Sequence, residues 1–290
     1  LTTVMKRVPT SHHSRRAGEE KLVVLAGETG RLLMYEDVPR RDADHKVPAA
    51  RNSAQFGAQF SDGASPPPQV RVPTAHLQET DRLQVRQDLY DTHIDICTPE
   101  LLVLLQDNFD WQDLRRDLLP GVLGQFEMLG KTIYTHVVSN EYAARVHDPH
   151  TYDAVSRDLI TRWAFPLVPE ANLLPGCSYS YGRGCVYKEN GVTLARSCRV
   201  GRDSVLGGGT TVGDGATIAA SAVGRNCTIG AAASLSECYL WANVVVEEGA
   251  QLSGCLCCDG VVVRRGAVVP RGCVLGPGVV VGAGARLPPF

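Results

Sequence analysis

The chain has 290 residues, of which 44% are hydrophobic and 21% are charged, and both shares are ordinary for a globular protein. Its formal net charge of -2 provides no basic excess to neutralise phosphates, which argues against direct binding of nucleic acid. It contains no apolar run of about 20 residues and no secretory signal, so we expect no membrane span and a cytosolic location. It begins with Leu1 instead of Met, which predicts a fragment that lacks both ends of a longer protein.

Strand signals come first in the chain, between residues 22 and 35. Leu22–Leu25 and Leu32–Tyr35 are short apolar runs separated by Gly27 and Gly30, a pattern that predicts a β-hairpin. Residues 39–78 are rich in Arg, Asp, Ala, Ser and Pro and have no periodicity that could bury one face. This composition predicts a disordered insertion.

Order is predicted again from residue 79 to residue 169. Leu89–Cys97 is typical of a strand, and Glu100–Leu105 begins a helix that Thr98 can cap. A second strand is predicted at Ile133–Val138 and a final helix at Thr151–Ala164. Apolar residues at near-helical spacing lie between them: Leu114, Leu118, Leu119, Val122 and Leu123. The mixture of strands and helices indicates an α/β layer architecture.

The second half of the chain has a repeat in which aliphatic residues recur at steps of six, six and five. One aliphatic residue in six is typical of one short strand and one turn, and three such steps close a triangular coil that stacks on the next. We therefore predict a left-handed parallel β-helix over residues 170–290, an exception to the right-handed crossover rule. The predicted inward residues are Leu206, Val212, Ile218, Val223, Ile229, Leu235, Leu240, Val246, Leu252, Cys257, Val263, Val269, Val274 and Val280, with Leu194 and Val200 upstream.

Glycine marks the same region, because 21 of the 29 glycines lie at or after Gly176. Several directly follow an inward aliphatic residue, and we attribute them to turn conformations that a side chain would penalise. These glycines are Gly201, Gly207, Gly213, Gly224 and Gly230. Small residues four positions after the aliphatic one are predicted to fill narrow corners: Ser204, Thr210, Ala216, Cys227, Ala233, Ala250 and Ala267.

Three groups of residues could suggest a metal site, a catalytic base or a phosphate-binding loop, and their patterns argue against each. Zinc could be bound by three cysteines, Cys255, Cys257 and Cys258. However, Cys257 falls on an inward position, and no further cysteine pair or histidine lies near in sequence to complete the ligand set. We therefore expect ordinary thiols. All eight histidines lie at or before His150, which leaves the β-helix without the base that a hexapeptide acyltransferase needs. The three glycines at 207–209 lack the Lys-Ser/Thr of a phosphate loop. We expect no catalytic residue, no metal and no cofactor.

Residues 107–111, Asp-Asn-Phe-Asp-Trp, are a candidate protein contact. An exposed aromatic residue beside an amide and carboxylates is typical of a contact point. The alternative is that the aromatic residues pack into their own domain, and the residues alone favour neither.

Several segments resemble a known family. An α/β region followed by hexapeptide coils is similar to nucleotidyltransferase-like proteins, either sugar-nucleotide pyrophosphorylases or the gamma and epsilon subunits of translation initiation factor 2B. The longer segments resemble the epsilon subunits specifically. These segments are residues 90–100 (Tyr-Asp-Thr-His-Ile-Asp-Ile-Cys-Thr-Pro-Glu), 107–110, 141–146 (Glu-Tyr-Ala-Ala-Arg-Val), 162–170 (Arg-Trp-Ala-Phe-Pro-Leu-Val-Pro-Glu) and 239–241 (Tyr-Leu-Trp).

The resemblance implies a partial nucleotidyltransferase-like domain in residues 1–38 and 79–169. It implies a subunit that promotes exchange of GDP for GTP on translation initiation factor 2, with the gamma and other subunits as partners. An Asn-Phe pair that contacts the GTPase in the family matches Asn108 and Phe109. Catalysis in the family lies mainly in a C-terminal helical-repeat domain, so we expect this chain to supply scaffold and GTPase contact. A sugar-nucleotide pyrophosphorylase and a purely structural subunit are the alternatives.

Overall fold

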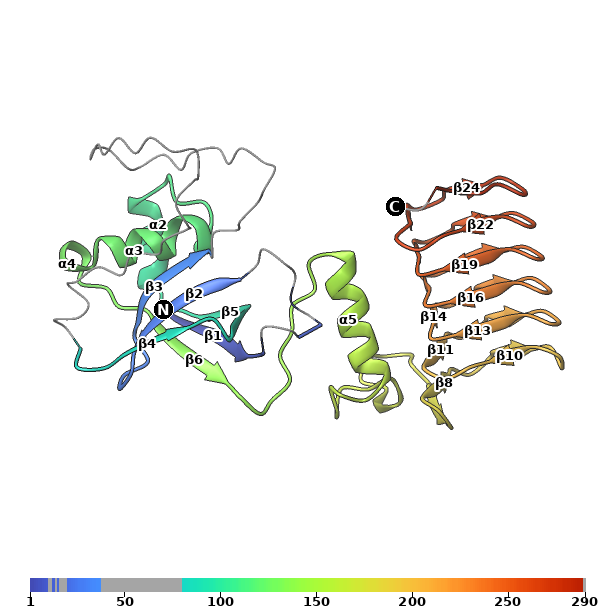
Figure 1. Cartoon of the computed structure of the whole chain (residues 1–290), viewed down its shortest axis with the longest axis horizontal. Helices are drawn as coiled ribbons and strands as arrows, with labels where there is room; N and C mark the ends of the chain where they lie inside the picture. Colours follow the sequence, from blue (N-terminus) through green and yellow to red (C-terminus); the bar gives the residue numbers. More distant parts are fainter. Residues whose placement is uncertain (10–11, 14, 16–19, 38–79, 289–290) are drawn as a thin grey trace, which may run out of the picture. The chain divides into compact units, whose positions relative to one another are not determined.

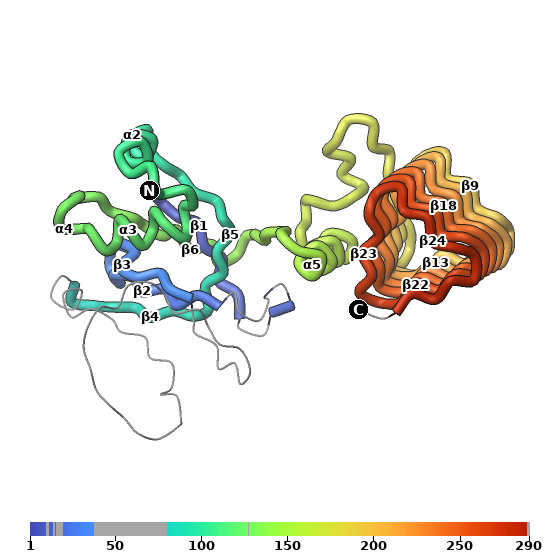
Figure 2. The backbone as a smooth tube through the Cα atoms, turned by 90° about the horizontal axis from the view of Figure 1, so that it is seen from above, coloured from blue at the N-terminus to red at the C-terminus, as the bar shows by residue number. Residues whose placement is uncertain are grey.

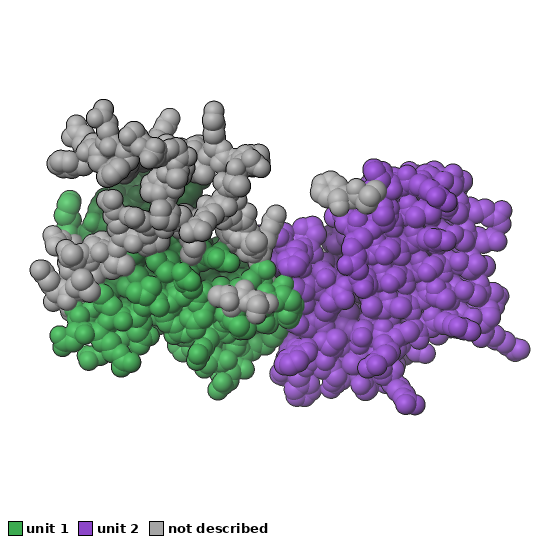
Figure 3. Space-filling view, in the orientation of Figure 1, with its two compact units in different colours: residues 1–145 green, residues 146–290 purple. Residues whose placement is uncertain are grey.

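The computed structural model describes residues 1–9, 12–13, 15, 20–37 and 80–288. The predicted disordered insertion at 39–78 lies outside the described residues. The chain forms two compact units, Leu1–Arg145 and Val146–Phe290 (Figure 3). Among the described residues, no helix combines the length and the apolar character that a membrane span requires.

The first unit contains two three-stranded sheets (Figure 1). In one sheet the central β1 pairs antiparallel with β5 and parallel with β6, and in the other β2 lies between β3 and β4. The hairpin predicted from the sequence is confirmed as the antiparallel pair β2 and β3. The strands are β1 (Thr2–Arg7), β2 (Lys21–Ala26), β3 (Leu32–Asp37), β4 (Leu83–Arg86), β5 (Leu89–Ile96) and β6 (Tyr134–Val138).

Short helices cover the core of this unit. They are α2 (Glu100–Asp107), a π-helical turn η1 (Leu114–Leu118), α3 (Leu119–Gly124) and α4 (Phe126–Leu129). Helix α2 begins where predicted, but no side chain caps it, so the capping role expected of Thr98 is wrong. Buried Leu118, Leu119 and Val122 pack with strand residues such as Met5 and Val23, which is the apolar face that the near-helical spacing predicted.

The second unit begins with helix α5 (Pro149–Ile160) and the 3₁₀ turn η2 (Pro169–Ala171). Asp148 and Thr151 form a capping box at the start of α5, which sets its first turn. The predicted division at residue 170 separates α5 from the β-helix in sequence, whereas the contacts place both in one unit. The domain limits predicted at residues 38, 78 and 169 stay predictions.

Three parallel sheets form the stacked triangular coils of the β-helix (Figure 2). The first sheet contains β7 (Ser180–Gly182), β8 (Val186–Lys188), β11 (Ser204–Leu206), β14 (Ala222–Val223), β17 (Tyr239–Leu240), β20 (Leu256–Cys257) and β23 (Val274–Leu275), with β7 antiparallel to β8. The second contains β9 (Thr193–Leu194), β12 (Thr211–Val212), β15 (Thr228–Ile229), β18 (Val245–Val246), β21 (Val262–Val263) and β24 (Val280–Val281). The third contains β10 (Arg199–Val200), β13 (Thr217–Ala219), β16 (Ser234–Ser236), β19 (Gln251–Ser253) and β22 (Val268–Val269).

The predicted inward positions are confirmed from Leu206 to Val269, all of which are buried in one core. The last two are wrong by one residue. Leu275 and Val281 are the buried ones, while Val274 and Val280 are exposed. The step from Val269 to Leu275 is six residues, as it is from Val200 to Leu206, whereas the three steps between the same two sheets in the intervening coils are five.

The glycines after the inward residues have a different cause from the one predicted. None of the five has a positive φ, which occurs later in the turns, for example at Gly215 and Gly266. Instead, a Cβ at Gly224 would lie 2.6 Å from the carbonyl oxygen of Trp241 in the next coil, and one at Gly207 would lie 2.6 Å from the backbone of Gly224. Four of these glycines, Gly207, Gly213, Gly224 and Gly230, are required because stacked coils approach closely. The small corner residues are buried as predicted.

Candidate functional site

Asn108 and Phe109 lie together at the C-terminal end of α2, in the first unit. The backbone N–H of Asn108 and its side-chain amide both donate to the carbonyl of Leu104, at 3.1 and 2.9 Å. The amide therefore adds a second hydrogen bond to a carbonyl of the last helical turn and holds Asn108 against the end of the helix. Phe109 follows with its side chain 81% exposed. Phe109 therefore does not pack into its own domain, and its role as a protein contact stays a prediction.

Trp111, two residues later, takes the opposite orientation and packs against the core of the unit. A Cβ at Gly121 would lie 2.4 Å from the indole ring, so this glycine makes room for Trp111. The N–H of Trp111 donates to the carbonyl of Asn108 at 2.9 Å. A half-buried aromatic side chain packed on the core thus fixes the short segment that presents Phe109.

The residues after Trp111 are held by two carboxylates. Asp113 accepts hydrogen bonds from the N–H groups of Arg115 and Arg116 at the start of η1. Asp117 accepts from the N–H groups of Gln112 and Asp113. These backbone hydrogen bonds lower the pKa of both carboxyl groups, so both are ionised near neutral pH.

Arg115 joins this segment to the sheet. Its Nε and Nη2 donate to Asp91 at 2.5 and 2.9 Å, and its Nη1 lies 2.9 Å from Asp95. The side chains of Arg115 and Asp91 are only 10% and 7% exposed. Tyr35 also donates to Asp91, at 2.7 Å. Burial alone would raise the pKa of Asp91, but the hydrogen bonds and charge of Arg115 outweigh it and hold that pKa below its usual value.

His93 marks an irregularity in the same strand. The register of β5 against β1 shifts between Val4 and Met5, and His93 has a left-handed φ of 55°. The Nη1 of Arg145 lies 2.6 Å from its Nε2. Burial lowers the pKa of His93, and Arg145 lowers it further against the opposing effect of Asp91. A neutral imidazole that accepts from Arg145 fits this arrangement.

The sequence identified Asn108 and Phe109 but missed the support of Arg115, Asp91 and Asp95. Two features of the sequence could have indicated this ion-pair cluster. Asp91 and Asp95 lie at even spacing on a predicted strand, and Arg115 lies inside an apolar helical pattern. The cysteines at 255, 257 and 258 are buried free thiols in the β-helix. Within the described ranges, no three His, Cys, Asp or Glu residues are arranged to hold a metal ion.

Known proteins resemble both halves of the chain. Residues 183–287 match the family model described as the EIF2B subunit epsilon LbH domain, which is a left-handed β-helix. Translation initiation factor eIF2B subunit epsilon of Schizosaccharomyces pombe is 36% identical over 214 residues, which cover 74% of this chain. The chain belongs to the eIF2B epsilon family. The subunit of Dictyostelium discoideum is 31% identical over 207 residues and 71% of the chain.

Membership of the eIF2B epsilon family confirms the resemblance and the predicted hand of the β-helix. The chain spans 28% and 26% of the lengths of these two relatives. Among solved structures, the acetyltransferase domain of PglB from Neisseria gonorrhoeae matches with a TM-score of 0.28 and 19% identity, over 52% of this chain and 64% of that one. A score that low carries no argument about this eIF2B epsilon chain.

Proposed function

We propose that this chain is part of an exchange-factor subunit that promotes replacement of GDP by GTP on translation initiation factor 2 in the cytosol. In this proposal the β-helix is a rigid scaffold, Asn108 and Phe109 contact the GTPase, and the gamma and other eIF2B subunits are partners. Membership of the eIF2B epsilon family supports the proposal. The sugar-nucleotide pyrophosphorylase is the disfavoured alternative.

The observation that carries the proposed contact is the exposure of Phe109 on a fixed backbone. The residues on both sides of Phe109 are held in place, since Asn108 is hydrogen-bonded to the last turn of α2 and Trp111 packs against the core. Leu102 and Val103 of α2 are exposed as well. A rigid aromatic side chain loses little conformational entropy on binding, which is why aromatic residues dominate binding energy at interfaces.

Nucleotide exchange requires no covalent chemistry. It requires a surface that binds the nucleotide-free GTPase more tightly than the GDP-bound form, because only differential affinity shifts an equilibrium. A fixed aromatic contact on a rigid support can supply such a difference.

The test is the affinity of the 290-residue chain for purified translation initiation factor 2, measured by biolayer interferometry with and without GDP. We expect tighter binding without GDP and a loss of about 30-fold in affinity for Phe109→Ala, the size expected of a hot-spot residue. Met128→Ala, which removes another exposed apolar side chain of the same unit, is the matched control and should change nothing.

Two outcomes would reverse the proposal. If Asn108→Ala and Phe109→Ala left both GTPase binding and nucleotide exchange by a full-length subunit unchanged, a purely structural subunit would be favoured. Turnover of a sugar nucleotide without GTPase binding would favour the pyrophosphorylase.

A further inference from the structure

The first coil of the β-helix carries an excess of positive charge. Residues 183–203 contain five cationic side chains and two carboxylates. One of these carboxylates, Glu189, is bonded to Arg225, two coils further on, and the other is Asp203. In the part of the chain that the structure describes, no carboxylate lies within ion-pairing distance of the five cations. All five are exposed, and they are Arg183, Lys188, Arg196, Arg199 and Arg202.

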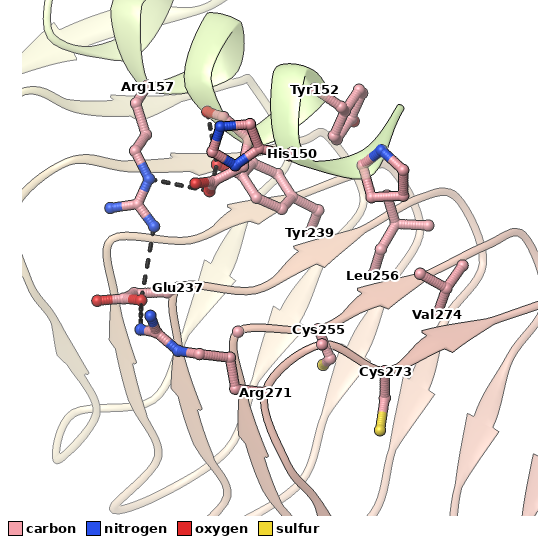
Figure 4. A pocket seen from close by; sticks show the side chains of 14 residues that line it. His150, Tyr152, Arg157, Glu237, Tyr239, Cys255, Leu256, Arg271, Cys273 and Val274 are labelled. Carbon is pink, nitrogen blue, oxygen red and sulfur yellow. Dashed lines mark hydrogen bonds and ion pairs between the residues drawn. The ribbon is translucent and has the colours of Figure 1, made fainter. Parts of the chain in front are cut away.

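Four arginines further along the β-helix are paired, in each case with a carboxylate from an earlier coil. Figure 4 shows one of them, Arg271, beside Glu237. The four pairs are Arg225 with Glu189, Arg264 with Glu247, Arg265 with Glu248, and Arg271 with Glu237. An arginine of the first coil has no earlier coil that could supply its carboxylate.

Arg196 occupies the same corner of its coil as Arg265. Each lies four residues before the inward residue of its third-sheet strand. In the coil before Arg265 this corner holds Glu248, its partner. In the coil after Arg196 it holds Asp214, whose carboxylate accepts from the hydroxyl of Ser197 at 2.8 Å instead of pairing with Arg196. A carboxylate on the other side of Arg196 would reproduce the later pair.

Strand β10 also has a free edge. It lies at the end of its sheet and pairs with β13, and no strand of the described residues pairs with its other side (Figure 1). The N–H groups of Arg199 and Gly201 donate to the next coil at 2.8 and 2.6 Å. Because successive residues of a strand direct their backbone groups to opposite sides, the N–H and carbonyl of Val200 face the free edge. Such groups can pair with an added polypeptide strand, whereas nucleic acid has no matching backbone.

The free edge and the charge together define the chemistry of an occupant. An extended polypeptide on this edge takes the position of an earlier coil, about 5 Å from β10. Exposed guanidinium groups pair best with carboxylates, so the polypeptide is acidic. Residues 39–78 of the chain itself are a poor source, because they contain five cationic side chains and three carboxylates.

We propose that the free edge of β10 docks an extended acidic segment of a partner protein. The segment pairs with the backbone of β10 and brings carboxylates to Arg196, Arg199 and Arg202. This inference goes beyond the proposed GTPase contact, since it concerns the second unit and does not depend on Asn108 or Phe109.

The probe is a fluorescent peptide of alternating Glu and Val, about 12 residues long, which is acidic and favours an extended strand. Its affinity for the 290-residue chain is measured by anisotropy at about 0.15 M salt. Arg199→Glu, and Arg196→Glu combined with Arg202→Glu, should each weaken binding by about tenfold or more. A copy methylated at every backbone nitrogen keeps the charge but cannot donate to the edge, and it should bind about tenfold more weakly.

Two paired arginines of the same β-helix are matched controls. Arg264→Glu and Arg265→Glu make the same change of charge as Arg199→Glu. The strand that follows them, β22, is four strands from β10 in the third sheet, about 19 Å away, which exceeds the screening length of about 8 Å. Both controls should leave the affinity within about twofold. Thermal melts of all the variants show whether each is folded.

Several results would overturn the proposal. Absence of binding up to about 1 mM peptide would mean that the cations only keep the edge from pairing with other chains. Equal losses in test and control variants, or equal binding of the methylated copy, would also contradict it. Oligouridylate that binds as tightly, with the same dependence on Arg199, would make nucleic acid the occupant. If sedimentation shows self-association that Arg199→Glu abolishes, a second copy of the chain is the occupant.

Discussion

The two units of this chain obtain their order in different ways. In the β-helix, each strand pairs with the strand one coil further on, so Ala222 meets Tyr239 and Tyr239 meets Leu256 in a single register. In the first unit, Arg115 meets a carboxylate 24 residues away, and the same carboxylate meets Tyr35 at a separation of 56 residues. The β-helix repeats the same strand pairing from coil to coil, whereas the first unit depends on individual contacts between distant segments.

This difference determines what a single residue does. A side chain in the β-helix fills a position that neighbouring coils also fill, and its loss affects the coils next to it. Arg115 has no equivalent in the described part of the first unit, because it neutralises two carboxylates and ties η1 to β5. The largest effects of substitution are therefore expected in the non-repetitive unit.

Arg115→Met should have the largest effect. It leaves the buried Asp91 without its cation, and breaking a buried ion pair from one side costs about 4 kcal/mol. The free energy of unfolding is measured in urea by the fluorescence of Trp111, with the other two tryptophans, Trp163 and Trp241, replaced by Phe. Arg116→Met removes a neighbouring exposed arginine and should cost little. Similar losses for both variants would contradict a special role for Arg115.

The same variant has a pH signature. In the wild type the pKa of Asp91 is below its usual value, so its contribution to stability is present above the unfolded pKa and is lost as the pH falls through the folded pKa. Without Arg115, burial raises the pKa of Asp91, and the variant becomes protonated at a higher pH than the wild type. The difference in unfolding free energy should therefore narrow as the pH is lowered from 7 towards about 4. A difference that stays constant with pH would count against the buried carboxylate.

The comparison of units also shows how far a sequence predicts a structure. The period of the β-helix identified the inward residues through Val269, because each coil repeats the same local rule. In the first unit, local patterns predicted β2, β3, β5 and β6 but not β1 or β4. The Arg115 cluster was also missed. It depends on which distant segments meet, and no local period encodes that.

Even in the repeat, the pattern of residues predicted positions for glycine but not the physical reason for them. Glycine was correctly singled out after several of the inward residues, but the reason is the backbone of the next coil rather than the backbone angle. The candidate contact had a similar limit. The residues of the segment 107–111 do not indicate which of its two aromatic side chains packs on the core, and only the space left by Gly121 assigns that packing to Trp111.

The cause assigned to these glycines can be tested by an effect of intermediate size. Gly224→Ala should cost about 3 kcal/mol, since its Cβ would lie 2.6 Å from the carbonyl oxygen of Trp241 and the stacked coil cannot move away. Gly266→Ala has open space around the new methyl group and meets only the penalty of its left-handed φ, about 1 kcal/mol. Urea unfolding followed by circular dichroism compares the two. Equal costs would contradict the close approach of stacked coils as the cause.

The smallest expected effect tests where the repeat changes its step. Leu275→Ala removes a buried side chain of the last described coil and should cost about 2 kcal/mol, the low end for such a change, because a coil at the end of a stack can relax. Val274→Ala removes an exposed side chain one residue earlier and should cost less than about 0.5 kcal/mol. The two positions would exchange their costs if the five-residue step continued through the corner at residues 270–273. Urea unfolding of this pair therefore reads the register of the final coil directly, and it separates a strict repeat from one that a longer corner has shifted.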